Sequence, residues 1–535
     1  DDILNGIYSI CEETAWQLPA HNSYIRDTPQ LILPDVTRPV MDLFACETGA
    51  LLACAAYLLE DDLNAVSPYI LTCIEDNLKR RILLPYLTAH FWWMGHDDEP
   101  MCNWTVWCTQ NVLLTTFLMP WSVEMSSRLS SPVRTFCGNA PLFLPENTSD
   151  TVVTLQAILH KAAESCDYFL KDYGNDGCCE EGAQYYRHAG LCLYGAMTVL
   201  NTVTDGHFDT LFRWDKVKNI ASYILNVHVN DKYYFNFADC SPIAGRAGVR
   251  EYLFGKATGQ EDLCLFAAKD FQAGQGQLVT DEVNGGNLFY RMQTVFHYEE
   301  LMQQNTSGTL SHRDVYYPSV GLFLVHSDTL DLAVKAGDNA DSHNHNDTGS
   351  ITLYKNGLPI LADIGVETYT RKTFSPRRYE IWTMQSGYHN LPTICGTDQK
   401  DGVEYRAENV MTVLTGAEPS ISMELAAAYP AAQAIVPDLT YVRKVTLKKP
   451  SNTVVLEDHT NAQDVILNFI TYEKPVILSD GKLSIGEASA SFEGADLLAI
   501  ETLPITDARL KTAWDHDLYR IRLKGSDAGF RLTIQ

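Results

Sequence analysis

HNHNDTGSITLYKNGLPILADIG, residues 343–365, is the stretch that decides how the second half of this chain folds. Two apolar runs flank Asn356-Gly357, a dipeptide that favours the tight turn of a two-residue β-hairpin. Counting outward from that turn places Asp363 opposite Ser350 on the neighbouring strand. The stretch therefore predicts an antiparallel hairpin that carries Asp363 towards the histidines preceding its first strand.

The sequence after about residue 306 has the pattern of β-structure. Short runs of alternating or β-branched residues recur between turn signals, and few segments have helical spacing. The runs are 320–326, 350–355, 358–364, 441–447, 453–457, 465–471, 518–523 and 529–534. So many strands in about 230 residues predict an antiparallel β-sandwich.

The first 300 residues have helical periodicity instead. The segments with this pattern are 42–59, a helix starting at Ser67-Pro68, 104–119, 153–171, 182–203, 209–227, 260–272 and 287–303. Helices with short polar connectors fit a bundle, a solenoid or a closed toroid, and periodicity leaves these alternatives open. The turn-forming run Asn305–Thr309 ends this half, so we expect domains over residues 1–305 and 306–535.

Composition and charge narrow the class of protein. With 46% hydrophobic and 20% charged residues, the 535-residue chain has a globular composition, and no apolar run reaches the length of a membrane span. The net charge of −27 argues against a nucleic-acid partner, which needs a basic surface. Fourteen scattered cysteines favour a reducing compartment, so a cytoplasmic location is expected over a secreted one. Whether the protein forms a homo-oligomer is left open by the sequence.

The densest polar cluster is Asp341–Asp347, at the start of the quoted stretch. His343 and His345 are two residues apart, so on an extended segment their side chains lie on the same side. Two histidines and a carboxylate such as Asp363 form a normal zinc ligand set. The alternative is a polar loop with surface histidines, because the spacing by itself matches no short metal motif.

Three motifs in this half resemble the signature of the heparinase II/III-like polysaccharide lyases. They are His343-x-His345-x-Asp347, Asp363-Ile364-Gly365 after the hairpin, and His389-Asn390 after an arginine-rich loop. The helical half also resembles that family at Asn103-Trp104 and over Asp176–Tyr185. The resemblance implies a multidomain α+β fold, with an N-terminal (α/α) toroid followed by a C-terminal antiparallel β-sandwich.

The resemblance also implies a metal centre and a reaction. His345, Asp363 and His389 would bind a divalent metal, with zinc favoured and a structural role expected more than a catalytic one. His343 would face the substrate rather than the metal. The implied activity is cleavage of a uronic-acid-containing polysaccharide, a glycosaminoglycan or an alginate-like chain, by β-elimination.

β-Elimination requires a base for the C5 proton, an acid for the O4 leaving group and neutralisation of the uronate carboxylate. In the family a toroid tyrosine follows the Asp-Gly-x-x motif and takes part in the reaction. Counting its spacing from Cys178 or Cys179 leads to Tyr233 or Tyr234, of which Tyr234 is favoured. Tyr234 and His343 would then exchange protons with the substrate. The structural alternative is a pair of aromatic residues packing at a helix end.

One departure from the family pattern concerns the neutralising group. Cys178 and Cys179 stand where some relatives carry His or Asn, and a thiol is a weak hydrogen-bond donor. Glu181, Tyr185 and His188 have the spacing of one helix face, which predicts that they point into the cleft, with Glu181 and His188 as catalytic groups and Tyr185 as a substrate-binding residue. His188 is thus one substitute for the neutralising group, and its alternative is a buried histidine with its own partners.

Four further residues are candidates for substrate binding. Asn103 is the second substitute for the neutralising group, and its structural alternative is an N-cap for the helix that starts at Trp104. Trp104 suits stacking on a sugar ring or packing in the core. Arg377 and Arg378 are either paired guanidiniums that bind a carboxylate or sulfate, or a solvated surface pair.

Two other classes of function remain open from the residues alone. A glycoside hydrolase needs two carboxylates across a cleft, which Glu180, Glu181 and Asp239 can supply. A non-catalytic carbohydrate-binding protein is compatible with the Cys178-Cys179 departure. The lyase interpretation is favoured, with an acidic polysaccharide or oligosaccharide as the substrate.

Overall fold

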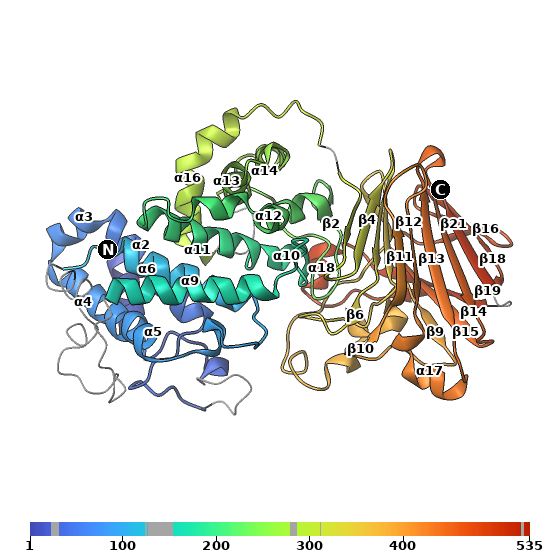
Figure 1. The fold of residues 1–535 in the computed structure, drawn as a ribbon, viewed down its shortest axis with the longest axis horizontal. Helices are drawn as coiled ribbons and strands as arrows, with labels where there is room; N and C mark the ends of the chain where they lie inside the picture. Colours follow the sequence, from blue (N-terminus) through green and yellow to red (C-terminus); the bar gives the residue numbers. More distant parts are fainter. Residues whose placement is uncertain (23–30, 123–125, 127–153, 279–285, 311, 526–528) are drawn as a thin grey trace.

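The computed structural model describes residues 1–22, 31–122, 126, 154–278, 286–310, 312–525 and 529–535. Helices make up the N-terminal part and antiparallel sheets the C-terminal part, and the two lie side by side along the long axis of the molecule (Figure 1). This arrangement confirms the predicted fold class.

The helices of the N-terminal part close into a ring. They are α1 (Asp2–Glu12), α2 (Leu43–Leu58), α3 (Glu60–Val66), α4 (Tyr69–Leu78), α5 (Leu84–Thr88), α6 (Asn103–Leu118), α9 (Thr154–Asp172), α10 (Gly182–Tyr186), α11 (Gly190–Val203), α12 (Asp215–Val227), α13 (Val249–Thr258), α14 (Glu261–Ala273) and α16 (Leu288–Gln303). α2 packs on α6, α6 on α11, α11 on α13, α13 on α16, and α16 returns to α2. Because the ring closes, the architecture is a toroid rather than a solenoid.

Helix α6 is buried around most of its circumference, which explains why its sequence carries no charged residue. Thr115 and Thr116 donate hydrogen bonds to carbonyls one turn back, whereas the buried hydroxyls of Thr105 and Thr109 have no hydrogen-bond partner in the described part of the chain. α11 approaches α6 closely at Gly195, where a Cβ would lie 1.8 Å from the amide oxygen of Gln110. A larger residue at position 195 would therefore displace the buried side chain of Gln110.

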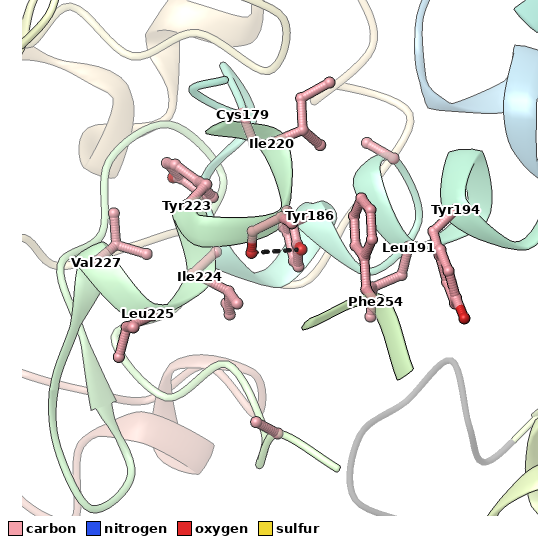
Figure 2. Packing of buried hydrophobic residues seen from close by; sticks show 14 of the residues in the cluster. Cys179, Tyr186, Leu191, Tyr194, Ile220, Tyr223, Ile224, Leu225, Val227 and Phe254 are labelled. Carbon is pink, nitrogen blue, oxygen red and sulfur yellow. Dashed lines mark hydrogen bonds between the residues drawn. The ribbon is translucent and has the colours of Figure 1, made fainter. Parts of the chain in front are cut away.

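Helix α12 packs its apolar face in the core of the toroid, beside α10 and α11 (Figure 2). Tyr186 anchors this contact, because its hydroxyl donates a hydrogen bond to the carbonyl of Ala221 at 3.2 Å. Cys179 belongs to the same apolar cluster and is 2% exposed. Its thiol therefore packs as a small apolar side chain.

Two predictions about the helices need correction. The segment 182–203 is not one helix, because α10 ends at Tyr186 and α11 begins at Gly190. Helix α13 was not predicted at all. It buries Arg250 and Glu251, two residue types that a periodicity argument assigns to solvent.

The sandwich consists of two large antiparallel sheets. One has the order β11 (Glu408–Val413), β12 (Ser420–Glu424), β13 (Tyr441–Lys448), β14 (Thr453–Thr460), β21 (Gly529–Ile534), β18 (Ala488–Glu493), β17 (Lys482–Ile485), β16 (Val476–Ser479). The other has the order β19 (Ala495–Leu503), β20 (Leu518–Gly525), β15 (Val465–Thr471), β8 (Leu358–Leu361), β7 (Ile351–Lys355), β5 (Leu330–Lys335), β4 (Leu322–His326), β3 (Val315–Tyr317), and β9 (Pro392–Ile394) also pairs with β15. One apolar cluster joins strands of both sheets.

Smaller elements complete the described part of the chain. β1 (His228–Asn230) pairs with β2 (Tyr233–Tyr234) beside the toroid, and β6 (Asp338–Asn339) pairs with β10 (Gly402–Arg406) beside the sandwich. The short helices α17 (Pro430–Ile435) and α18 (Leu510–Ala513) lie in the C-terminal half. Every run that the sequence analysis predicted as a strand contains a strand in the structure.

The β7–β8 hairpin turns at Asn356-Gly357 as predicted, but its register shifts by one residue and Leu353 pairs with Leu361. β8 ends at Leu361, so the predicted pairing of Asp363 with Ser350 is wrong. Because of this irregularity and the end of β8, Asp363 does not take part in the strand pairing of the hairpin. Its side chain is therefore available for contacts outside the sheet.

The toroid and the sandwich share apolar contacts at their junction. Tyr317 and Tyr354 of the sandwich belong to the same buried cluster as the toroid core. The Tyr354 hydroxyl donates a hydrogen bond to the carbonyl of Tyr234 at 3.3 Å. The predicted division after residue 305 lies in the connection between α16 and β3, and it stays a prediction.

Two expectations from composition concern the cysteines and the membrane. The thirteen cysteines in the described ranges are all free thiols. Over the same ranges, no single helix combines the length and the apolar content needed to cross a membrane. Only α2 and α3 together reach that length and apolar content, and these two helices are bent by 81° relative to each other.

Candidate active site and metal centre

A cleft of about 980 Å³ is lined by residues of both the toroid and the sandwich. The toroid contributes aromatic and polar side chains from α6 and α10, and the sandwich contributes the segment 339–344 and the loop before His389. The predicted site residues among its lining are Asn103, Trp104, Glu181, Tyr185, His343 and Arg378. Residues from two distant parts of the sequence thus share one concave surface, which is typical of a ligand site.

His343 lies in the wall of this cleft in an unusual conformation. Its φ of 60° is in the left-handed region, which a non-glycine residue rarely adopts. Its Nδ1 lies 2.9 Å from Asp239 Oδ2, and Arg378 donates a hydrogen bond to its carbonyl at 2.9 Å. Burial lowers the pKa of His343, but the hydrogen bond to Asp239 and the charges of Glu181 and Asp239 outweigh burial, so the pKa is raised above its ordinary value.

Asp239 is fully buried and accepts hydrogen bonds from four side chains. Besides His343, these are His345 Nε2 at 3.0 Å, Arg378 Nη2 at 2.6 Å and the Tyr369 hydroxyl at 3.0 Å. Burial raises the pKa of Asp239, and the hydrogen bonds from the two histidines with the charge of Arg378 outweigh it and hold the pKa well below its usual range. The ionised carboxylate therefore orients both histidines.

Tyr185 stacks on His343, with ring centroids 4.7 Å apart and planes 19° from parallel. Its hydroxyl lies 2.5 Å from the Tyr369 hydroxyl, and the Arg509 guanidinium lies 4.5 Å from the Tyr369 ring centroid. Burial raises the pKa of Tyr185 to about 12, although Tyr369 and Arg509 oppose the increase. Tyr185 is thus a neutral phenol at pH 7, next to a second hydroxyl.

Asn103 and Glu181 form a buried pair at the toroid side of the cleft. Asn103 Nδ2 donates a hydrogen bond to Glu181 Oε2 at 2.8 Å, so its side chain does not cap α6. The same carboxylate oxygen lies 3.8 Å from His343 Nε2. Burial raises the pKa of Glu181 to about 7, although the charge of His343 opposes it. Near neutral pH this carboxyl is therefore partly protonated and able to donate a hydrogen bond.

His345, Asp363 and His389 converge from three separate segments. All three are buried, and one nitrogen or oxygen atom of each lies within 4.8 Å of the others. His389 Nδ1 lies 3.0 Å from Asp363 Oδ2, and the two imidazole centroids are 5.4 Å apart. The structure thus brings together the three residues predicted as metal ligands.

These residues fit a divalent metal. His345 Nδ1 is buried and has no hydrogen-bond partner in the described part of the chain, whereas His345 Nε2 is paired with Asp239. His389 Nε2 lies 3.2 Å from the carbonyl oxygen of Thr383. Outer contacts of this kind orient metal-binding histidines, and two nitrogens with one oxygen suit zinc. The metal and its identity stay a proposal.

The structure places Tyr234 outside the cleft. It is fully buried, its ring centroid is 5.0 Å from that of His228, and it is not among the residues that line the cleft. Burial raises the pKa of Tyr234 far above its ordinary value despite the charge of Arg187. Tyr233, the alternative that the sequence left open, does not line the cleft either. Among the tyrosines predicted for the site, Tyr185 is the one that contacts His343.

His188 and Arg377 also lie away from the cleft lining. The break after α10 ends the helix face on which His188 was predicted, and its ring lies 4.1 Å from that of Trp107. Burial lowers the pKa of His188 to about 3, so it offers no charge to a substrate carboxylate. Arg377 is exposed and pairs with Glu380 at 2.8 Å, as in the solvated alternative.

Sequence reasoning missed two partners of His343. Asp239 was considered only as a hydrolase carboxylate, although an acidic residue within the apolar run 233–240 is a signal of a buried, paired carboxylate. Tyr369 gives no signal in the sequence. Both contact His343 from more than twenty residues away, so only the fold reveals them.

Comparison with known proteins supports the same architecture. Residues 309–465 match the family model described as heparinase II/III-like, C-terminal. A sequence comparison with curated proteins gives no match.

Solved structures with the same fold have low identity to this chain. A heparinase III is 12% identical, with a TM-score of 0.55 over 96% of this chain and 71% of the other. A heparinase III with methylated lysines is 13% identical, with a TM-score of 0.52 over 91% of this chain and 66% of the other. A chondroitin AC lyase of Streptomyces coelicolor A3 in complex with chondroitin sulphate is 10% identical, with a TM-score of 0.54 over 100% of this chain and 79% of the other.

The helical toroid followed by a β-sandwich is the fold that this chain shares with the heparinase III and chondroitin AC lyase structures. The match over residues 309–465 confirms the resemblance predicted from the sequence motifs, and over this part the chain resembles the heparinase II/III-like proteins.

Proposed function

We propose that this chain cleaves a uronate-containing polysaccharide, a glycosaminoglycan or an alginate-like chain, by β-elimination. The observation that carries the proposal is the stacked pair of Tyr185 and His343 in the cleft, with His343 backed by the carboxylate of Asp239. This pair offers a base and a neutral phenol to one sugar ring. The heparinase and chondroitin lyase structures that share the fold support the same reaction class.

His343 removes the C5 proton. When its Nδ1–H donates to Asp239, the tautomer leaves a lone pair on Nε2, the nitrogen on the side of Glu181. The buried carboxylate of Asp239 then stabilises the imidazolium that forms.

Tyr185 supplies the proton for the leaving group. As the C4–O4 bond breaks and the C4–C5 double bond forms, its hydroxyl protonates O4. The phenolate that remains is adjacent to the Tyr369 hydroxyl at 2.5 Å, which provides a path for a new proton. Arg509 adds positive charge beside this pair of tyrosines.

Asn103 and Glu181 neutralise the substrate carboxylate. Both line the cleft, and the protonated form of Glu181 donates to a carboxylate, as does the Asn103 amide. Cys178 and Cys179 are buried and do not line this cleft, so the departure from the family pattern removes no group from it.

The hydrolase alternative is less favoured by the geometry. A glycosidase needs two carboxylates free to act on a substrate or on water. Asp239 is instead fully buried and held by four side chains, so it is not free to act as one of the pair.

The proposal is tested by the ultraviolet absorbance of unsaturated uronates. The protein is incubated with hyaluronan, chondroitin sulfate, heparan sulfate, heparin and alginate in turn, with zinc present. A rise in absorbance with one class supports the lyase and identifies the uronate. Folded protein, confirmed by circular dichroism, that gives no rise with any of the five contradicts the proposal.

The neighbouring arginines provide a matched test of the site. Arg378→Ala should lower kcat/KM about 10- to 100-fold, because it removes charged hydrogen bonds to Asp239 and to the His343 carbonyl. Arg377→Ala should leave kcat/KM unchanged, since the Arg377 side chain pairs only with exposed Glu380 among the described interactions. Equal losses in both variants would contradict the placement of Arg378 at the site.

The pKa of His343 predicts the acid limb of the pH profile. Because the proposed base must be neutral and its pKa is raised, kcat/KM should rise with pH through a value above the ordinary histidine pKa. Asp239→Asn removes the contact that raises this pKa, so the limb should move to lower pH while kcat falls. Metal content is measured in parallel because Asp239 also contacts His345. An acid limb unmoved by the substitution would exclude His343 as the titrating base.

A further inference from the structure

A second group of histidines lies at the junction of toroid and sandwich, separate from His345 and His389. His228 begins β1 beside the toroid, His312 lies in the connection before β3, and His326 ends β4 of the sandwich. The ring centroids of His312 and His326 are 5.1 Å apart, and those of His228 and His312 are 6.0 Å apart. Three imidazoles from three segments thus share one small region.

Each of these imidazoles has a buried nitrogen without a hydrogen-bond partner in the described ranges: His228 Nδ1, His312 Nε2 and His326 Nε2. His228 Nε2 lies 3.1 Å from the carbonyl oxygen of Asp231, so its neutral tautomer keeps the lone pair on Nδ1. His326 Nδ1 lies 2.8 Å from Asp331 Oδ1. Contacts to a carbonyl and a carboxylate are those that orient metal-binding histidines.

A carboxylate completes the set. Asp331 is the second residue of the return strand β5 and lies directly opposite His326 in the β4–β5 ladder. One nitrogen or oxygen atom from each of His312, His326 and Asp331 lies within 4.8 Å of the others. Burying several polar nitrogens without hydrogen-bond partners is unfavourable, so their grouping indicates a shared partner.

We propose that His312, His326 and Asp331, with His228 beside them, bind a second divalent transition-metal ion. Imidazole nitrogens with one carboxylate suit zinc, whereas calcium and magnesium select oxygen ligands. Apolar rings surround the group, with Phe266 4.7 Å from His228 and Phe235 6.1 Å from His326. This shell restricts water and favours neutral imidazoles, the form that binds metal.

The position of the group assigns a structural role to this metal. His228 belongs to the helical part, whereas His326 and Asp331 belong to a sandwich hairpin, and His312 lies on the connection between them. An ion bound there links the two parts of the protein outside the cleft, whose lining includes none of these residues. It would stabilise their relative position without taking part in the reaction.

Metal content of the full-length protein tests the proposal. After growth with zinc and dialysis against a weak chelator, the metal-to-protein ratio is measured by mass spectrometry for wild type, His312→Ala, His389→Ala, the double variant and the control His207→Ala. His312 is only partly buried, so its replacement leaves the core intact, and His207 is an exposed toroid histidine. His312→Ala should lose about one equivalent relative to wild type, and His207→Ala none.

The same variants separate this site from the predicted one. His389→Ala should keep the equivalent that His312→Ala loses, and zinc should raise the Tm of His389→Ala but not that of the double variant. An unchanged metal content in His312→Ala overturns the proposal, as does a wild-type protein that holds no metal. Loss of all metal in His389→Ala alone overturns it as well. None of these readouts depends on lyase activity.

Discussion

Replacing Tyr185 by phenylalanine should lower kcat about 10²- to 10⁴-fold, the usual contribution of a positioned acid or base. The substitution removes the hydroxyl that contacts Tyr369 and keeps the ring that stacks on His343, so binding of the sugar should change less than kcat. The measurement is the initial rate of double-bond formation on a substrate that the wild type cleaves, at several substrate concentrations.

Tyr234→Phe is the matched control for that experiment. It removes the same hydroxyl from a tyrosine that is fully buried and outside the cleft, so kcat should stay at the wild-type value. Circular dichroism and thermal unfolding check that both variants fold. If Tyr234→Phe loses activity and Tyr185→Phe retains it, the tyrosine predicted from spacing is the proton-transfer group and the arrangement proposed here is wrong.

Replacing His389 by alanine should abolish binding of the metal proposed for His345, Asp363 and His389, and destabilise the protein by about 3–5 kcal/mol. The reason is that Asp363 is buried and has His389 Nδ1 at 3.0 Å, so the variant leaves a buried carboxylate without its imidazole. Denaturant unfolding gives the stability, and the metal-to-protein ratio gives the occupancy.

His459→Ala serves as the control for the metal centre, because His459 is exposed on β14 of the same sandwich. It should keep both stability and metal content. A chelator should destabilise the wild type and His459→Ala more than His389→Ala, because the last variant has already lost this metal. Equal chelator responses in all three proteins would contradict a metal held by His389.

The two halves of the site differ in how far the sequence could predict them. The ligand set His345, Asp363 and His389 was predicted from the resemblance of three short motifs, on either side of one hairpin and in the loop after it, and the structure brings these residues together. The choice of tyrosine depended on a spacing along the chain, and that spacing leads to Tyr234, which the fold buries. Tyr185, predicted as a binding residue, is the one that contacts His343.

By itself the sequence determined the division into a helical half and a β half, the turn at Asn356-Gly357 and the resemblance of the motifs, because each of these depends on residues that are close along the chain. The closure of the toroid was decided only by the contact of α16 with α2. The helix break after Tyr186 directed His188 away from the cleft. The hydrogen bond between His343 and Asp239 joins residues that are 104 positions apart in the sequence. Such contacts depend on packing between distant segments, which no local pattern encodes.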